Sequence, residues 1–276
     1  MKKHNTNSPP KLAALLFGAA LLGLVSQSAL AAGTASGTVV TNLAKLNYSV
    51  GGVAQGAICS SPTGNGTADD DGTCVSGAFG AVNTDFAVDN KVDLLVTEGN
   101  STYTTVVAGQ TAATTTFTVK NEGNTTQDFK LDVASLANGT VLFTKTDNFD
   151  GTSCTVSNIA ISSGSMGTYT ALDQHINALT AESIATVTVS CNIPAAQANN
   201  SFAAISLKAT GRTDNAANTM GGALSETANT EDGVEIVYGD SAGTDDTTGV
   251  GDAEHSARDG YFVQTATLTV TKTVAT

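Results

Sequence analysis

The sequence predicts an all-β protein in which short strands pack as a sandwich of two sheets. Apolar and polar residues alternate with a period of two over most of the chain after residue 31. Clusters of Gly, Asn, Asp and Ser separate these segments at short intervals, which is typical of antiparallel sandwiches rather than of parallel sheets. Thr and Val, which suit the half-buried face of a pleated sheet, are abundant.

Residues 1–31 predict a cleavable secretory signal peptide. Lysines open the segment, and its apolar run Leu12–Val25 is shorter than the roughly 20 residues that a membrane-spanning helix needs. Ala29 and Ala31 then form the small-residue pattern at which signal peptides are cut. No second apolar stretch follows, so we expect no membrane span after cleavage. We expect the mature chain in the periplasm, on the outer surface or in the medium of a diderm bacterium.

Residues 32–100 predict an N-terminal region of hairpins and strands. Apolar residues alternate through Val40–Val50, and the Gly51-Gly52 pair then turns the chain into Val53–Ile58, which is a hairpin signal. A loop rich in Gly, Ser and Asp follows from Cys59 to Gly80. We expect a disulfide to close that loop.

Residues 101–211 carry the clearest strand pattern and predict the body of the sandwich. Phe117 and Val119 share one face of a strand, a turn follows, and alternation resumes at Phe129. Further strands are expected at Val141–Phe143, Val156–Ile161, Ile184–Ile193 and Ala203–Ala209. Ala171–Leu179 has a weak helical pattern and is expected to form a turn or loop.

Residues 212–276 predict an acidic loop and a final strand that packs back on the body. One short strand is expected at Val234–Tyr238, and Asp240–Gly260 predicts a long mobile loop. Tyr261–Val274 predicts a strong final strand, in which apolar residues alternate with Thr.

Several of these segments resemble a known family. Val107–Thr111 and Thr116–Asn124 combine a Gly turn, a strand of the F-x-V-x-N type and a Gly-Asn turn. This resembles the opening of the immunoglobulin-like "conserved repeat" domains of bacterial surface and secreted proteins. Similar stretches occur at Gly33–Ala44, Asn192–Pro194, Ile205–Thr210 and Leu268–Lys272. The resemblance implies an immunoglobulin-like β-sandwich with extra N- and C-terminal strands and a long acidic loop, and it implies no defined activity.

The charge of the mature chain excludes two kinds of partner. Residues 1–31 hold three of the 12 Lys and Arg residues and none of the 25 Asp and Glu residues, so the mature chain has a net charge of −16. A surface of this sign repels nucleic acid and anionic lipid. We therefore expect no nucleic-acid partner.

The four cysteines, Cys59, Cys74, Cys154 and Cys191, predict two disulfides in an exported chain. Sequence order favours pairing the first two with each other and the last two with each other, although four cysteines allow three pairings. Zinc sites need closely spaced pairs such as C-x-x-C, which the sequence lacks.

Catalytic motifs are absent from the sequence, and we expect no enzyme. Only His175 and His255 follow the signal peptide, and neither stands in an H-E-x-x-H or G-x-S-x-G context. His255 is expected to be a solvated loop residue beside Glu254. A hydrolase would require one of these histidines to lie in a cleft beside an acid and a nucleophile.

Calcium is the only cofactor for which the sequence offers candidate ligands, which are carboxylates in two acidic clusters. The candidates are Asp69, Asp70, Asp71, Asp240, Asp245, Asp246 and Asp252. Neither cluster has the D-x-D-x-D-G spacing of a calcium loop, and charge runs are usually solvated. An intramolecular Lys–Asn crosslink is a further option, for which Lys91, Lys120 and Lys272 are eligible.

Both ends of the mature chain are alternating β segments, Val39–Val50 and Tyr261–Val274. Terminal strands commonly close the sheets of their own domain. A terminal strand can also be donated to the sheet edge of a neighbouring copy, and such a contact builds filaments because it does not close on itself.

The sequence therefore predicts a secreted, non-enzymatic structural or adhesive surface protein. Its expected partners are copies of itself or other surface proteins. The alternative is an extracellular carbohydrate- or ligand-binding sandwich, which predicts an exposed aromatic platform. The sequence contains no Trp, but Tyr103, Tyr169 and Tyr261 are available for this role.

Overall fold

The structure is a computed structural model of the 276-residue chain. It describes residues 33–40, 44–61, 64–67, 74, 86–169, 174–215, 218–227, 233–245, 249–265 and 270–272. The chain divides into two units, Met1–Ala31 and Ala32–Thr276, and every described residue belongs to the second. The predicted signal peptide lies outside the described residues.

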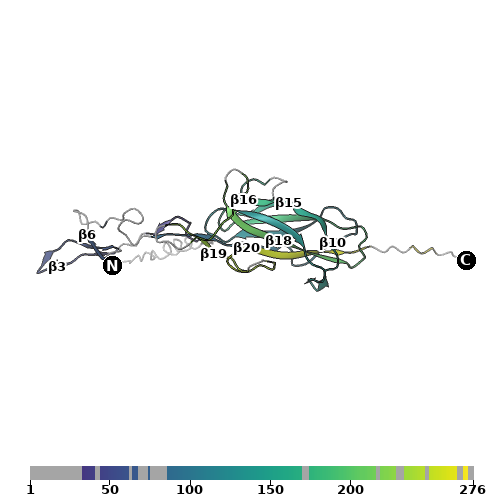
Figure 1. Ribbon diagram of the computed structural model, residues 1–276, viewed down its shortest axis with the longest axis horizontal. Helices are drawn as coiled ribbons and strands as arrows, with labels where there is room; N and C mark the ends of the chain where they lie inside the picture. The colour runs from purple at the N-terminus through teal and green to yellow at the C-terminus, as the bar shows by residue number, and fades with distance from the viewer. Residues whose placement is uncertain are drawn as a thin grey trace, which may run out of the picture. The chain divides into compact units, whose positions relative to one another are not determined.

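Two sheets form an immunoglobulin-like β-sandwich (Figure 1). The four-stranded sheet has the order β9-β11-β17-β15, and the five-stranded sheet has the order β10-β20-β18-β12-β16. Within these two sheets, all neighbouring strands are antiparallel except β10 and β20, which are parallel. The strand bounds are β9 (Leu94–Glu98), β10 (Thr104–Val106), β11 (Ala113–Asn121), β12 (Gln127–Ser135), β15 (Thr152–Ser163), β16 (His175–Leu179), β17 (Ile184–Asn192), β18 (Phe202–Thr213) and β20 (Glu254–Val263).

The topology matches that of a seven-stranded immunoglobulin domain. In chain order, β9, β11, β12, β15, β17, β18 and β20 take the places of strands A to G. One sheet then has the order A-B-E-D and the other contains C-F-G, as in immunoglobulin constant domains. The strands β10 and β16 extend the second sheet at its two edges.

The core lies between the sheets because alternate residues of each strand point inward. Phe117 pairs with Val187, and Val119 pairs with Ala185, and all four side chains are fully buried. Tyr261 on β20 is also fully buried and faces them from the five-stranded sheet. The predicted β-sandwich is therefore confirmed, although two of its strands, β9 and β20, lie outside residues 101–211.

Short ribbons precede the sandwich or flank its loops. Gly51 and Gly52 both have positive φ, which suits the tight hairpin turn predicted there, and Val50 pairs with Val53 across it. The short strands are β1 (Val39–Val40), β2 (Lys45–Leu46), β3 (Ser49–Val50), β4 (Val53–Ala54), β5 (Ile58–Ser61), β6 (Gly64–Thr67), β7 (Phe86–Ala87), β8 (Asn90–Val92), β13 (Val141–Leu142), β14 (Lys145–Thr146) and β19 (Ile236–Tyr238). They pair as β1 with β7, β2 with β5 and β6, β3 with β4, β8 with β19, and β13 with β14.

The expected turn or loop at Ala171–Leu179 is wrong for its second half. His175–Leu179 forms β16, the edge strand beside β12. Ile176 and Leu179 are both fully buried although they are three positions apart. Ala178 has a positive φ and the pairing with β12 is irregular here, so the strand does not show a regular two-residue period.

The predicted C-terminal loop and strand are shifted relative to the structure. Glu254–Val263 forms β20, so the expected loop is shorter than predicted and the strand starts seven residues earlier. The inward face of β20 includes His255 and Asp259, and these polar residues hide the alternation in the sequence. Gln264 and Thr265 lie outside any strand, as do Val270, Thr271 and Lys272. The rest of the predicted final strand lies outside the described residues.

Candidate functional site

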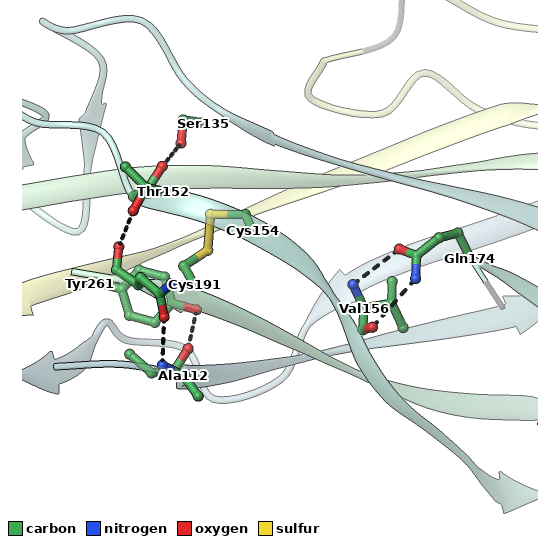
Figure 2. The surroundings of a disulfide bond; sticks show 11 residues. Ala112, Ser135, Thr152, Cys154, Val156, Gln174, Cys191 and Tyr261 are labelled. Atoms are coloured by element: carbon green, nitrogen blue, oxygen red, sulfur yellow. Dashed lines mark hydrogen bonds between the residues drawn. A yellow bond between two sulfur atoms is a disulfide. The ribbon is translucent and has the colours of Figure 1, made fainter. Parts of the chain in front are cut away.

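The two disulfides join the cysteine pairs that sequence order favours. Cys59 bonds to Cys74, with Cα atoms 5.7 Å apart, and Cys154 bonds to Cys191, with Cα atoms 4.1 Å apart. The second disulfide connects neighbouring strands β15 and β17 at the border of the core (Figure 2). It fixes one end of β15 to the strand beside it.

Strand β15 forms an open edge of the four-stranded sheet. It spans 12 residues and pairs only with β17 among the described strands. No charged residue occurs along it. Three irregularities interrupt its pairing with β17, after Thr152, after Val156 and after Ile161. The sequence predicted this strand but gave no sign that it lies at an edge.

The side chain of Gln174 covers part of this edge (Figure 2). Its Oε1 accepts a hydrogen bond from the backbone N–H of Val156 at 3.2 Å, and its Nε2 donates to the carbonyl of the same residue at 3.5 Å. The side-chain amide thus pairs with Val156 much as a neighbouring strand would. The backbone carbonyl of Gln174 also accepts from the N–H of Leu131 on β12.

The far end of the β15 edge leaves part of the core uncovered. Ile161 lies opposite Ala185, which is fully buried in the core, so both face the interior. The side chain of Ile161 is nevertheless 43% exposed, whereas Ile159, two residues earlier, is buried. An additional strand beside β15 would cover Ile161.

A buried polar contact connects the two sheets. The hydroxyl of Thr115 on β11 donates to Oδ2 of Asp259 on β20, and both side chains are buried. Oδ1 of Asp259 accepts from the backbone N–H of Gly260. Burial, assisted by the nearby charge of Glu98, raises the pKa of Asp259 to about 6 in spite of these hydrogen bonds. The sequence pattern does not reveal this contact, because Asp240–Gly260 has the composition of a loop.

The two histidines lie on opposite faces of the five-stranded sheet. His255 points into the sandwich, where its Nδ1 accepts from the backbone N–H of Val96. The prediction that it is a solvated loop residue is therefore wrong. His175 lies opposite Lys130 on the outer face and is also largely buried. The sheet separates the two imidazoles, so they do not form a common catalytic group.

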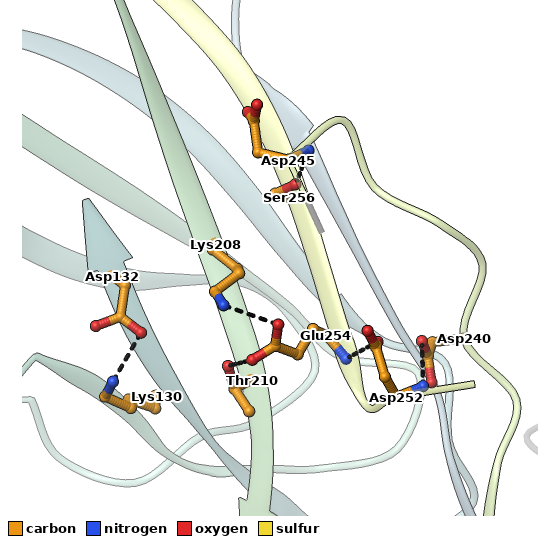
Figure 3. Close-up of polar contacts among 9 residues, drawn as sticks. All are labelled: Lys130, Asp132, Lys208, Thr210, Asp240, Asp245, Asp252, Glu254 and Ser256. Carbon is orange, nitrogen blue, oxygen red and sulfur yellow. Dashed lines mark hydrogen bonds and ion pairs between the residues drawn. The ribbon is translucent and has the colours of Figure 1, made fainter. Parts of the chain in front are cut away.

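Three of the calcium candidates, Asp240, Asp245 and Asp252, make contacts within the chain, and Oδ1 of Asp252 accepts from the backbone N–H of Glu254. The carboxylate of Asp240 accepts backbone N–H groups of Asp252 and Ala253, and burial raises its pKa. Asp245 forms an ion pair with Arg258. Figure 3 shows Asp240 and Asp245 near β20, together with the Lys208–Glu254 ion pair on the outer face. Asp69, Asp70, Asp71 and Asp246 lie outside the described residues. Within the described part of the chain, no group of three or more potential ligands is arranged to hold a metal ion.

Two of the three lysines that are eligible for a Lys–Asn crosslink form ion pairs with carboxylates. Lys91 pairs with Asp93, and Lys120 pairs with Glu122 and Glu182. The hydrogen bond to Glu182 is the main reason that the pKa of Lys120 is raised.

The three tyrosines proposed as a ligand platform are partly or fully enclosed. Tyr261 is in the core, where its hydroxyl donates to the carbonyl of Ala113. Tyr103 packs among Phe143, Phe202 and Phe262, and its ring centroid lies 4.8 Å from that of Phe262. Tyr169 packs half-buried against the sandwich core. None of them forms an exposed flat aromatic surface.

Exposed large apolar side chains occur at several places in the described residues, including segments near both ends of residues 32–276. The hairpin of β3 and β4 exposes Val50 and Val53, and Leu46 and Tyr48 just before it are also exposed. Val270, beyond the last strand, is 93% exposed. The four N-terminal residues and Val270 lie in segments with the period-two alternation of a β-strand.

Comparison with known proteins gives no family for this chain. No family model and no curated protein matches it. Among solved structures, a PapD-like domain of human CEP192 matches at 14% identity and a TM-score of 0.27, covering 63% of this chain and 87% of that domain. A family 123 glycoside hydrolase from Clostridium perfringens matches at 7% identity and a TM-score of 0.28, and the match covers 63% of this chain and 28% of the hydrolase. No helix in the described residues is long and apolar enough to cross a membrane.

Proposed function

We propose that this is a secreted, non-enzymatic structural or adhesive surface protein that assembles with copies of itself by β-strand addition. The observation that carries the proposal is the exposure of large apolar side chains on strand-like segments near both ends of the mature chain. Leu46, Tyr48, Val50 and Val53 form one group, and Val270 marks the other. Exposed apolar β segments favour pairing with other chains, and proteins normally protect them unless they are used.

The predicted location supports the same function. A cleavable signal peptide directs the chain out of the cytoplasm, and two disulfides persist in oxidising compartments. They would also preserve the folded subunit where no chaperone acts. We place the protein on the outer surface or in the medium, where a filament would have room to grow.

The positions of the aromatic side chains make a carbohydrate-binding role the weaker alternative. Such sites usually stack sugar rings on exposed aromatic faces, whereas the candidate tyrosines are half-buried or fully buried. Assembly requires no such surface. It requires an exposed strand and a sheet edge, and the described residues provide candidates for both.

Electron microscopy and sedimentation of the mature chain test the proposal. The full mature chain should form filaments. Variants lacking Ala32–Thr41 or Leu268–Thr276 should show which of these two end segments is required for filament formation. Loss of filaments in at least one truncation, with the sandwich still folded by circular dichroism, would support the proposal. A mature chain that stays monomeric at all concentrations, or two truncations that sediment like the full chain, would contradict it.

A further inference from the structure

We propose that residues Ser157–Ser163 of β15 accept the C-terminal segment Thr265–Val274 of a second copy as an added strand. This inference rests on the proposed assembly function and names its two contact elements. It requires an edge that can accept a strand, a strand that its own domain does not use, and a reason for the two to belong to different copies.

The first requirement is met by β15 better than by the other described edges of the sandwich. It has 12 residues, whereas β9 and β16 have five each and β10 has three. Natural edge strands are commonly protected by charges or proline, and β15 has neither. The protective feature that it shares with such edges is irregular pairing, at three positions along its described length.

The accepting part of β15 can be narrowed to its second half. The amide of Gln174 occupies the backbone N–H and carbonyl of Val156, and the Cys154–Cys191 disulfide fixes the strand nearby. Beyond Val156, the structure shows no strand beside β15 on its outer edge among the described residues. Ile161 in this half faces the core but is 43% exposed. A strand added here would pair with backbone groups and also bury Ile161.

The C-terminal segment has the sequence of a strand but does not act as one in its own chain where it is described. Thr occupies every odd position from 265 to 273, and the even positions hold Ala266, Leu268, Val270, Lys272 and Val274. Such alternation predicts one face of Thr and one largely apolar face, on which Lys272 is the single charged residue. Val270–Lys272 lie outside any strand, and Val270 is almost fully exposed. Covering that apolar face would therefore stabilise an assembled state relative to the separate subunits.

Sheet order indicates that the donor and acceptor belong to different copies. The tail leaves β20 beside β10, where the N–H of Gln264 donates to the carbonyl of Val106. The β15 edge is at the other side of the sandwich, because Gln174 connects it with β12, whose neighbour β16 forms the far edge of the five-stranded sheet. A tail that reaches the β15 edge of the next copy makes a contact between different surfaces. Such contacts build open filaments.

Charge favours the same pair of elements. The mature chain has a net charge of −16, so most surfaces of two copies repel each other. The tail from Thr265 onward contains no acidic residue and a single Lys, and β15 contains no charged residue. Contact between these two elements therefore brings no carboxylates together.

Lysine substitutions test the acceptor in the full mature chain. Ile161→Lys should raise the protein concentration needed for filament formation by at least about tenfold, because burying a charge against an apolar strand costs more than the ~1.4 kcal/mol that this factor represents. Val141→Lys is the matched control, since Val141 is exposed on the short strand β13. The control should assemble like the parent chain.

A second pair of variants tests the two faces of the donated C-terminal segment separately. Val270→Lys places a charge on the predicted apolar face and should impair assembly, whereas Thr271→Lys changes the opposite face and should have little effect. Equal effects of these two substitutions would show that the tail does not pair as an alternating strand. Circular dichroism and thermal melting of unassembled protein would verify that each variant is folded.

A crosslink between copies identifies the contact directly. Ile161→Cys and Val270→Cys chains, mixed and then oxidised, should give a disulfide-linked pair in which mass spectrometry finds the peptides of both positions joined. Filaments that form without this crosslink and that tolerate both Ile161→Lys and Val270→Lys would overturn the inference but leave the proposed function standing. Failure of the parent chain to assemble would refute the proposed function itself.

Discussion

Asp259 places a carboxyl group between the two sheets, where a charge is costly. The side chain is fully buried, and its hydrogen bonds from Thr115 and Gly260 compensate only part of the lost hydration. Its pKa of about 6 lies above the value of about 3.9 expected in an unfolded chain. The folded state therefore binds this proton more tightly than the unfolded state does.

The sign of the resulting pH dependence follows from linkage. The contribution of Asp259 to stability is fully present below about pH 4 and is lost as the pH rises through about 6. Asp259→Asn removes this titration. We expect the free energy of unfolding of the parent chain to fall by about 2 kcal/mol more than that of the variant between pH 4 and pH 7, measured by urea unfolding.

Asp132→Asn is the control for this experiment, because Asp132 pairs with Lys130 on the outer face and is well exposed. It measures the effect of replacing a carboxyl group by an amide at an exposed position of the same sheet. A parent chain and Asp259→Asn variant with parallel pH profiles would show that the carboxyl group of Asp259 titrates alike in the folded and unfolded states.

At the scale of strands, regular alternation allowed prediction from sequence and local irregularity did not. β11 and β17 were predicted because their inward positions are mostly apolar, with Phe117 and Val119 on the first and Val187 and Val189 on the second. β16 and most of β20 were missed, the first because Ala178 interrupts its period and the second because His255 and Asp259 point inward. Each polar residue is satisfied by a partner on another strand, which a single segment of sequence cannot reveal.

The features of the candidate assembly site, like the strands, could be predicted from sequence only where they depend on local pattern. The predicted signal peptide and an even number of cysteines indicated both disulfides, and alternation indicated that the tail is strand-like. The open edge at β15 depends on strand order, which is set by contacts between distant segments. The amide of Gln174, 18 residues from Val156, is a contact of the same kind.

The two disulfides should differ in their effect on the sandwich. Replacing Cys154 and Cys191 by Ser should lower its free energy of unfolding by about 4 kcal/mol, because the bond closes a loop of 37 residues and joins two core strands. Replacing Cys59 and Cys74 by Ser should change it by less than about 0.5 kcal/mol, because β5 belongs to a separate three-stranded sheet.

Urea unfolding followed by tyrosine fluorescence would measure both effects, since Tyr261 reports on the core. Equal losses in the two double variants would mean that the N-terminal ribbons and the sandwich unfold as one cooperative unit.

For the whole molecule, charge opposes assembly and apolar contact favours it. A net charge of −16 on the mature chain gives a repulsion between copies that acts over roughly 10 Å at 0.1 M salt and over about 30 Å at 0.01 M. The proposed contact elements carry almost none of this charge. Salt should therefore weaken the repulsion and leave the strand contact largely intact.

Filament growth of the mature chain should accordingly be several-fold faster at 0.15 M NaCl than at 0.01 M, as followed by light scattering. Calcium chloride at matched ionic strength separates screening from binding, because Asp69, Asp70 and Asp71 remain candidate ligands. If screening alone acts, calcium and sodium salts give the same rate. Faster growth in calcium that is abolished by replacing these three residues with Asn would instead show that a bound cation takes part in assembly, and growth that slows with added salt would show that attraction between charges holds the copies together.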